Sequence, residues 1–204
     1  MRYKSLANLV YQNQLVPTSG NDIRAICDGK INIINYSDLQ SIYSSGGSIY
    51  DLFQPELNNC VGLLYQLKGQ NVGHWVCLIY DAGSDTSESA NGTAGTIRFF
   101  NSYGFGPDQE IDLFQHPQPY LTMLLNKSHS KIDVNKFKFQ SLKNDISTCG
   151  LHCGVRCVFH ELSNKDYLKF LSSYDNDRTK NYDKLVTLMC LLPLDYNITR
   201  SPQG

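Results

Sequence analysis

The spacing of hydrophobic positions changes twice along the chain. Over residues 1–59, "KSLANLVYQNQLV" and "SGNDIRAICDG" carry apolar residues at helical spacing, and Ser19 or Asn21 is a suitable N-cap for the second segment. Residues 30–59 are rich in Tyr, Ser and Gly, which favours short helices joined by turns. The first part of the chain is therefore predicted to be helical.

Patterns typical of strands begin at residue 60. The runs "CVGLLYQL" (60–67), "HWVCLIYD" (74–81) and "TIRFFNSY" (96–103) are β-branched and aromatic, with Gly, Asn or Asp at their ends. The polar segment "AGSDTSESANGTAG" between the last two predicts an exposed hairpin loop. "FKFQSL" at 137–142 is predicted to be a fourth strand.

Helical spacing returns towards the C-terminus. "PQPYLTMLLNKSH" predicts a surface helix, "CGLHCGVRCVFHELS" a buried helix that begins at Cys149, and "DYLKFLSSY" and "DKLVTLMCLL" two closing helices, the last ended by Pro193. We expect one α+β domain over the whole chain, with a helical part, a sheet part and a second helical part: 1–204, divided into 1–59, 60–142 and 149–204.

Composition adds few constraints on function. The chain has 204 residues, 41% of them apolar, which suits one substantial core. Its 18 basic and 19 acidic residues nearly cancel, so no strong field favours nucleic acid or an anionic membrane. The first residues make a poor secretory signal, and the longest apolar runs are too short to span a bilayer. We expect an intracellular monomer that is neither secreted nor held in a membrane.

Four of the seven cysteines stand alone among apolar residues: Cys27, Cys60, Cys77 and Cys190. Such cysteines usually act as small buried hydrophobes in a reducing compartment. The others lie in "CGLHCGVRC" at residues 149–157, where no second ligand pair completes a zinc site. We therefore expect no bound metal, with Cys153 and Cys157 on the inner face of a helix and with His152 and His160 solvated or capping.

Cys149 has a different local context. The turn-forming run "NDIST" precedes it and Gly150 follows, so its thiol lies where a loop enters a helix. The positive end of the helix dipole and free backbone N–H groups there are expected to lower the thiol pKa and to bind a substrate oxyanion. Gly150 would let a substrate backbone come close. This context favours a nucleophile.

A nucleophilic cysteine needs a base and a group that orients the base. His74 opens a predicted strand, where it would be rigid yet open to a cleft. Asn101 ends the next strand, and antiparallel pairing could place its carboxamide against the imidazole and select the ring tautomer. Read singly, both residues have ordinary explanations, a strand-end histidine and a turn asparagine.

The succession "GHW", "FFNSYGFG" and a glutamine before "CG" resembles the class of cysteine proteases that contains adenovirus endopeptidase and the ubiquitin-like-protein proteases. The resemblance covers roughly residues 60 to 160. It implies a papain-like α+β fold with a rearranged chain order, a central, mostly antiparallel sheet flanked by helices, and the nucleophile at a helix N-terminus.

The same resemblance implies a role for each matching residue: Cys149 as nucleophile, His74 as general base and then acid, Asn101 as the orienting group, and Trp75 as a wall of a narrow groove. It also implies that the Cys149 amide joins a glutamine side chain in an oxyanion hole.

Two departures from the family pattern stand out. Most relatives carry Asp or Glu where Asn101 stands. The glutamine usually precedes the cysteine by six or seven residues, whereas Gln140 lies nine residues before Cys149. We favour Gln140 for the oxyanion hole, and Asn144 is the alternative.

The resemblance implies a maturation protease of a DNA virus, virophage or Polinton-type element. Such an enzyme would cleave capsid or core precursors at Gly-containing, small-residue sites in the host cytoplasm or virus factory, would be packaged in the virion, and would need no cofactor. Whether a peptide or DNA activates it is open. One alternative is a deconjugase of a ubiquitin-like modifier. Another is a non-catalytic metal-binding or interaction domain.

Overall fold

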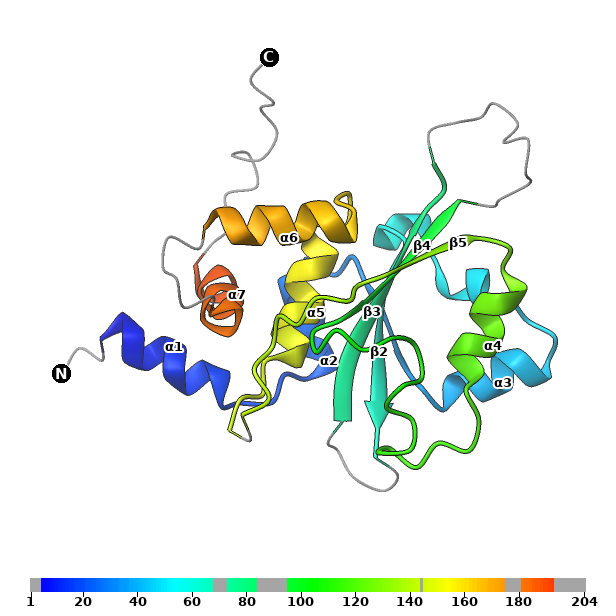
Figure 1. Cartoon of the computed structure of the whole chain (residues 1–204), viewed down its shortest axis with the longest axis horizontal. Helices are drawn as coiled ribbons and strands as arrows, with labels where there is room; N and C mark the ends of the chain where they lie inside the picture. The colour runs from blue at the N-terminus through cyan, green and yellow to red at the C-terminus, as the bar shows by residue number, and fades with distance from the viewer. Residues whose placement is uncertain (1–4, 68–72, 84–94, 144, 175–180, 193–204) are drawn as a thin grey trace, which may run out of the picture.

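The computed structural model describes five stretches of the chain: residues 5–67, 73–83, 95–143, 145–174 and 181–192. Within them the chain forms an α+β fold in which one five-stranded sheet separates two groups of helices (Figure 1). No helix in these stretches combines the length and apolar character needed to cross a membrane.

The sheet is mixed, with its strands in sequence order. Its central strands pair antiparallel, whereas the first and last strands pair parallel with their neighbours, so the expected mostly antiparallel sheet is antiparallel only at its centre. Three of the four predicted strands are confirmed, and the two edge strands were not predicted. The strands are β1 (Asn32–Asn35), β2 (Cys60–Gln66), β3 (Gly73–Asp81), β4 (Thr96–Asn101) and β5 (Lys131–Val134).

The strand predicted at 137–142 is wrong. The chain there crosses the end of β4 without a ladder, because the backbone N–H groups of Phe139 and Gln140 both donate to the Ser102 carbonyl. The Asn135 side chain satisfies the neighbouring backbone by donating to the Asn101 carbonyl and accepting from the Phe137 N–H. The predicted hairpin loop after β3 lies largely outside the described residues.

The predicted helices are present, and Ser19 caps the second one through a capping box with Asp22. Helices α3 and α4 cover one face of the sheet, and α2, α5, α6 and α7 lie on the other (Figure 1). The helices are α1 (Leu6–Gln14), α2 (Gly20–Ile26), α3 (Asp38–Ser44), α4 (Tyr120–Lys127), α5 (Cys149–Val158), α6 (Asn164–Ser173) and α7 (Tyr182–Leu191), with 3₁₀ turns at Ile49–Leu52 and Pro55–Leu57.

Alternate residues of β3 enter two separate cores. Val76 and Leu78 point towards α3 and α4, whereas Trp75, Cys77 and Ile79 point towards α2 and α5. All five side chains are buried. Packing on both faces therefore fixes the strand rigidly up to its first residues, where His74 stands.

Helix α5 packs against β3 of the sheet and against α2 and α7. Its two glycines let α2 and the segment before it lie close, because a Cβ on Gly154 would lie 2.9 Å from an Ile26 methyl carbon and one on Gly150 would lie 2.5 Å from the Thr18 Cβ. The contacts with β3 place the N-terminus of α5, and with it Cys149, next to the start of β3.

Candidate active site

A cleft of about 700 Å³ lies where the ends of β2 and β3 meet the start of α5. Its lining includes four of the residues predicted for the site: Cys149, His74, Trp75 and Gln140. Asn101 lies directly behind His74. The structure thus gathers the predicted nucleophile, base, orienting group and oxyanion donor from segments far apart in the sequence.

The strand register explains how Asn101 reaches His74. β3 and β4 pair antiparallel with Val76 opposite Asn101, and His74 lies on the same face of β3 two residues before Val76. The His74 Nε2 and the Asn101 Oδ1 are 3.0 Å apart, and both residues are buried. The contact expected from antiparallel pairing is confirmed.

The neighbours of Asn101 determine the tautomer of His74. Asn101 Oδ1 also accepts from the Tyr103 backbone N–H at 2.9 Å, and Asn101 Nδ2 donates to Glu110 Oε2 at 2.5 Å. A backbone N–H can only donate and a carboxylate can only accept, so the carboxamide orientation is fixed. His74 Nε2 must therefore carry a proton, which leaves Nδ1 as the basic nitrogen of the neutral ring.

Burial keeps that ring neutral. Burial lowers the pKa of His74 to about 4. The hydrogen bond with Asn101 opposes this shift, and the nearby His152 adds to it. The Tyr103 ring stacks on the imidazole with 4.7 Å between the ring centres. At neutral pH, His74 is an uncharged, rigidly held base.

Cys149 is the first residue of α5 and is partly exposed. Burial of the site raises the pKa of its thiol, although the backbone N–H groups of Trp75, Gly150 and Cys149 itself oppose the rise. The expectation of a lowered thiol pKa is therefore wrong, because desolvation outweighs the helix terminus. The site therefore pairs a neutral thiol with a neutral imidazole.

Gln140 is buried at the edge of the cleft. Its Oε1 accepts from the Ser102 hydroxyl at 2.7 Å, so Nε2 is the donor end of the amide. One long contact of 3.4 Å to the Ile146 carbonyl cannot use both hydrogens of that nitrogen. Gln140 can therefore offer an N–H to an oxyanion, whereas the alternative residue, Asn144, lies outside the described residues.

The two predicted substrate-binding residues differ in position. Trp75 lines the cleft and donates from Nε1 to the Thr18 carbonyl at 2.9 Å, which fixes the indole as a wall. Gly150 is buried and absent from the cleft lining, and its missing side chain makes room for Thr18. The predicted contact between Gly150 and a substrate backbone stays a prediction.

Two polar groups next to the site were missed at the level of sequence. Glu110 is buried in the loop after β4, nine residues beyond Asn101, and no periodic pattern marks it. His152, expected to be solvated or capping, is fully buried, with Nε2 3.0 Å from Asp183 Oδ1. Asp183 also accepts from the Thr148 hydroxyl and the Ser141 backbone N–H, which connects α7 to the start of α5.

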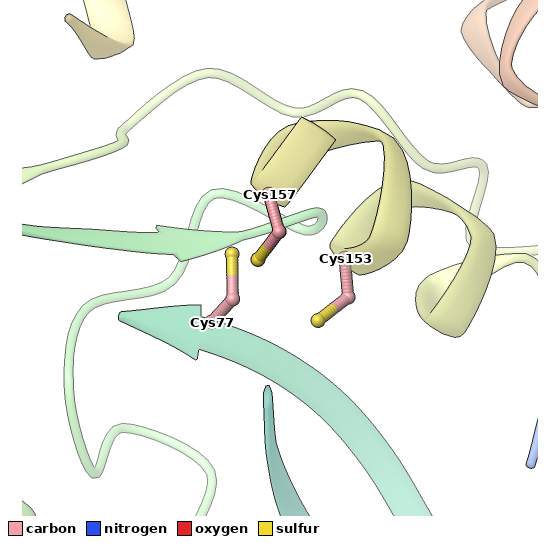
Figure 2. A group of neighbouring side chains, drawn as sticks. All are labelled: Cys77, Cys153 and Cys157. Carbon is pink, nitrogen blue, oxygen red and sulfur yellow. The ribbon is translucent and has the colours of Figure 1, made fainter. Parts of the chain in front are cut away.

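Three buried cysteines form a separate group between α5 and β3 (Figure 2). The sulfur atoms of Cys77, Cys153 and Cys157 all lie within 4.8 Å of one another, a spacing at which thiolates can hold a thiophilic ion. None of them lines the cleft, all belong to the apolar core, and the Cys153 thiol contacts the Val76 carbonyl at 3.4 Å. We assign them to packing, as the sequence predicted for Cys153 and Cys157.

The fold and site define an α+β protein with a cysteine, a histidine and an asparagine arranged around one cleft. No protein-family model matches the chain. A curated relative, "Uncharacterized protein V9" of the Sputnik virophage, is 33% identical over 184 residues, which cover 86% of this chain and 95% of the relative. The chain therefore belongs to the same family as this virophage protein, in agreement with the viral connection expected from the sequence.

Proposed function

We propose that the protein is a cysteine endopeptidase that cleaves viral precursor polypeptides through Cys149, His74 and Asn101. The observation that carries the proposal is the shared cleft: Cys149 and His74 both line it, and the only tautomer compatible with Asn101 leaves His74 Nδ1 unprotonated. We propose equally that the fold is papain-like with a rearranged chain order.

In the proposed reaction, the Cys149 sulfur attacks the scissile carbonyl carbon while its proton passes to His74 Nδ1. The electron pair of the carbonyl moves to its oxygen, which accepts from the Cys149 amide and from Gln140 Nε2. The C–N bond then breaks, and His74 returns the proton to the leaving amine. Water, deprotonated by His74, attacks the thioester, releases the carboxylic acid and restores the thiol.

Neutral partners require the proton to move while the sulfur attacks. The depressed pKa of His74 leaves the imidazole unprotonated at neutral pH but makes it a weaker base, and the raised pKa of Cys149 keeps the sulfur protonated until a substrate is present. Asn101 orients the ring through Nε2 and carries no charge of its own. The proposed enzyme therefore works by base-assisted attack, without a standing thiolate–imidazolium pair.

The shape of the cleft guides the proposed specificity. Trp75 walls it on one side, and Leu64, Leu113 and Phe114 add apolar surface. A peptide bound in extended form would place small residues such as glycine beside the Trp75 wall and apolar side chains against the other residues. The virophage relative supports only the viral connection, and viral precursors as the substrate class are part of the proposal. The expected host compartment, packaging in virions and monomeric state remain predictions.

The test is incubation of wild-type and Cys149→Ala protein with capsid and core precursors of the parent virus, followed by mass spectrometry of new termini. We expect new N-termini after Gly-containing sites with the wild type and none with the variant. Cleavage of ubiquitin-like conjugates in place of the precursors would favour the deconjugase. Cleavage of neither, together with stoichiometric zinc, would favour a non-catalytic metal-binding domain.

A further inference from the structure

We infer that Glu110 is the carboxylate of this site and acts on His74 through Asn101. The inference rests on the proposed peptidase function and adds a residue to it. Asn101 alone is neutral, and it stands where a charged group would stabilise the imidazolium that forms during attack. Glu110 Oε2 lies 2.5 Å from Asn101 Nδ2 and 3.8 Å from His74 Nε2.

The contacts of Asn101 give Glu110 two separate effects. As an acceptor, Glu110 holds Asn101 Nδ2, so that Asn101 Oδ1 faces His74. Together with the hydrogen bond from the Tyr103 N–H to the same Oδ1, this contact fixes the tautomer of the His74 ring. As a charge it is the one carboxylate that forms an ion pair with His74 among the described residues, at 3.8 Å from Nε2. The first effect is geometric, the second electrostatic, and substitutions can separate them.

The loop that carries Glu110 is anchored to the protein core. Asp108 accepts from the hydroxyls of Tyr36 and Tyr65 at 2.6 and 3.1 Å, and from the backbone N–H of Thr122 at 2.7 Å. Glu110, two residues later, is 7% exposed. Its carboxylate is therefore held in place before any substrate binds, as a positioning residue requires.

Partial desolvation gives the carboxyl an unusual titration. Burial raises the pKa of Glu110, and the hydrogen bond from Asn101 opposes the rise. The carboxylate is present above that pKa and lost as the pH falls through it. The groups that face it are His74, Asn101 and, more distantly, Cys149 and Tyr103.

The test compares Glu110→Gln with the matched control Asp112→Asn, an exposed acid on the same loop. The carboxamide oxygen introduced by Glu110→Gln can still accept from Asn101, so only the charge is removed. We expect kcat/KM on a cleaved precursor peptide, and the rate of Cys149 alkylation by iodoacetamide at pH 7, to fall by about tenfold to a hundredfold. On the acid side, the pH profile of kcat/KM should lose the step that comes from protonation of the Glu110 carboxylate. Asp112→Asn should match the wild type.

A double variant restores the charge at the neighbouring position. When Asn101→Asp is combined with Glu110→Gln, the carboxylate introduced at position 101 can accept from His74 and Tyr103, and the carboxamide introduced at position 110 can donate to its second oxygen. We expect this variant to regain most of the activity that Glu110→Gln loses, at an unchanged thermal midpoint. A purely structural role for Glu110 predicts no such recovery.

The outcomes separate this inference from the proposed function. If wild-type Cys149 reacts no faster than the buried cysteines, the peptidase proposal fails, and the role of Glu110 fails with it. If the wild type is active and Glu110→Gln stays within twofold of it across the pH profile, only the inference about Glu110 is overturned.

Discussion

The protein contains two buried histidines whose Nε2 atoms lie 3.0 Å from a side-chain oxygen, and their surroundings differ. His74 meets a carboxamide, Asn101, at the edge of a cleft, whereas His152 meets a carboxylate, Asp183, within the packing of α5 and α7. His74 lines the cleft, and its Nδ1 has no hydrogen-bond partner among the described residues. His152 Nδ1 is sealed without a partner in the same part of the chain. The same contact thus occurs at a cleft, where we propose that it serves chemistry, and within packed helices.

The largest expected effect separates these two histidines. His74→Ala should reduce kcat/KM on a precursor peptide by roughly 10⁴-fold, because the base is lost while the cleft remains. His152→Ala should leave Cys149 chemistry measurable but lower the thermal midpoint. If both variants lose activity to the same extent when the same fraction of each protein is folded, the proposed difference between the two histidines is contradicted.

Gln140→Ala should have the next largest effect. Losing one oxyanion donor costs about 3 kcal/mol of transition-state stabilisation, so kcat should fall about a hundredfold with KM little changed. Steady-state kinetics measure this split. If Asn144→Ala produces the loss and Gln140→Ala does not, Asn144 supplies the donor.

Asp183→Asn should show the structural character of the second pair. The Asp183 side chain accepts from His152, Thr148 and the Ser141 backbone, and its pKa lies below the ordinary value although burial opposes this. Removing the charge from such a buried group should lower the free energy of unfolding by about 3 kcal/mol. Urea unfolding measures the change, and a loss below about 1 kcal/mol would contradict this account.

The effect spread over the widest range of conditions is a pH dependence of stability, which reaches its full size only at the acid end. The folded-state pKa of His74 is lowered to about 4, so the unfolded chain binds more protons than the folded chain between that value and pH 6.5. Stability should therefore rise with pH across this window, by up to about 3 kcal/mol from His74. His74→Gln should flatten the dependence in urea titrations, and an unchanged slope would argue against a neutral buried imidazole.

The sequence reveals the parts of this site that lie on regular elements. His74 and Asn101 follow from two adjacent strand patterns, because antiparallel pairing brings the start of one strand near the end of the next. Cys149 follows from the turn residues that precede a helix. Each of these signals is local.

The remaining features depend on contacts between distant segments. Glu110 reaches Asn101 because Asp108 is held by Tyr36 and Tyr65, and no local pattern encodes that meeting. The chain at 137–142 has strand-like composition, yet its backbone N–H groups donate to the Ser102 carbonyl and to the Asn135 side chain. These hydrogen bonds take the place of pairing with another strand. The raised pKa of the Cys149 thiol also depends on distant segments, because its desolvation comes from the whole cleft.

The central claim is that His74 activates the sulfur of Cys149. The most direct measurement is peptide mapping by mass spectrometry after treatment at pH 7 with a peptide vinyl sulfone, an electrophile that needs an activated thiol. We predict a single adduct at Cys149 in the wild type and none in His74→Ala. Adducts spread over several cysteines, or an equal yield at Cys149 without His74, would contradict the account.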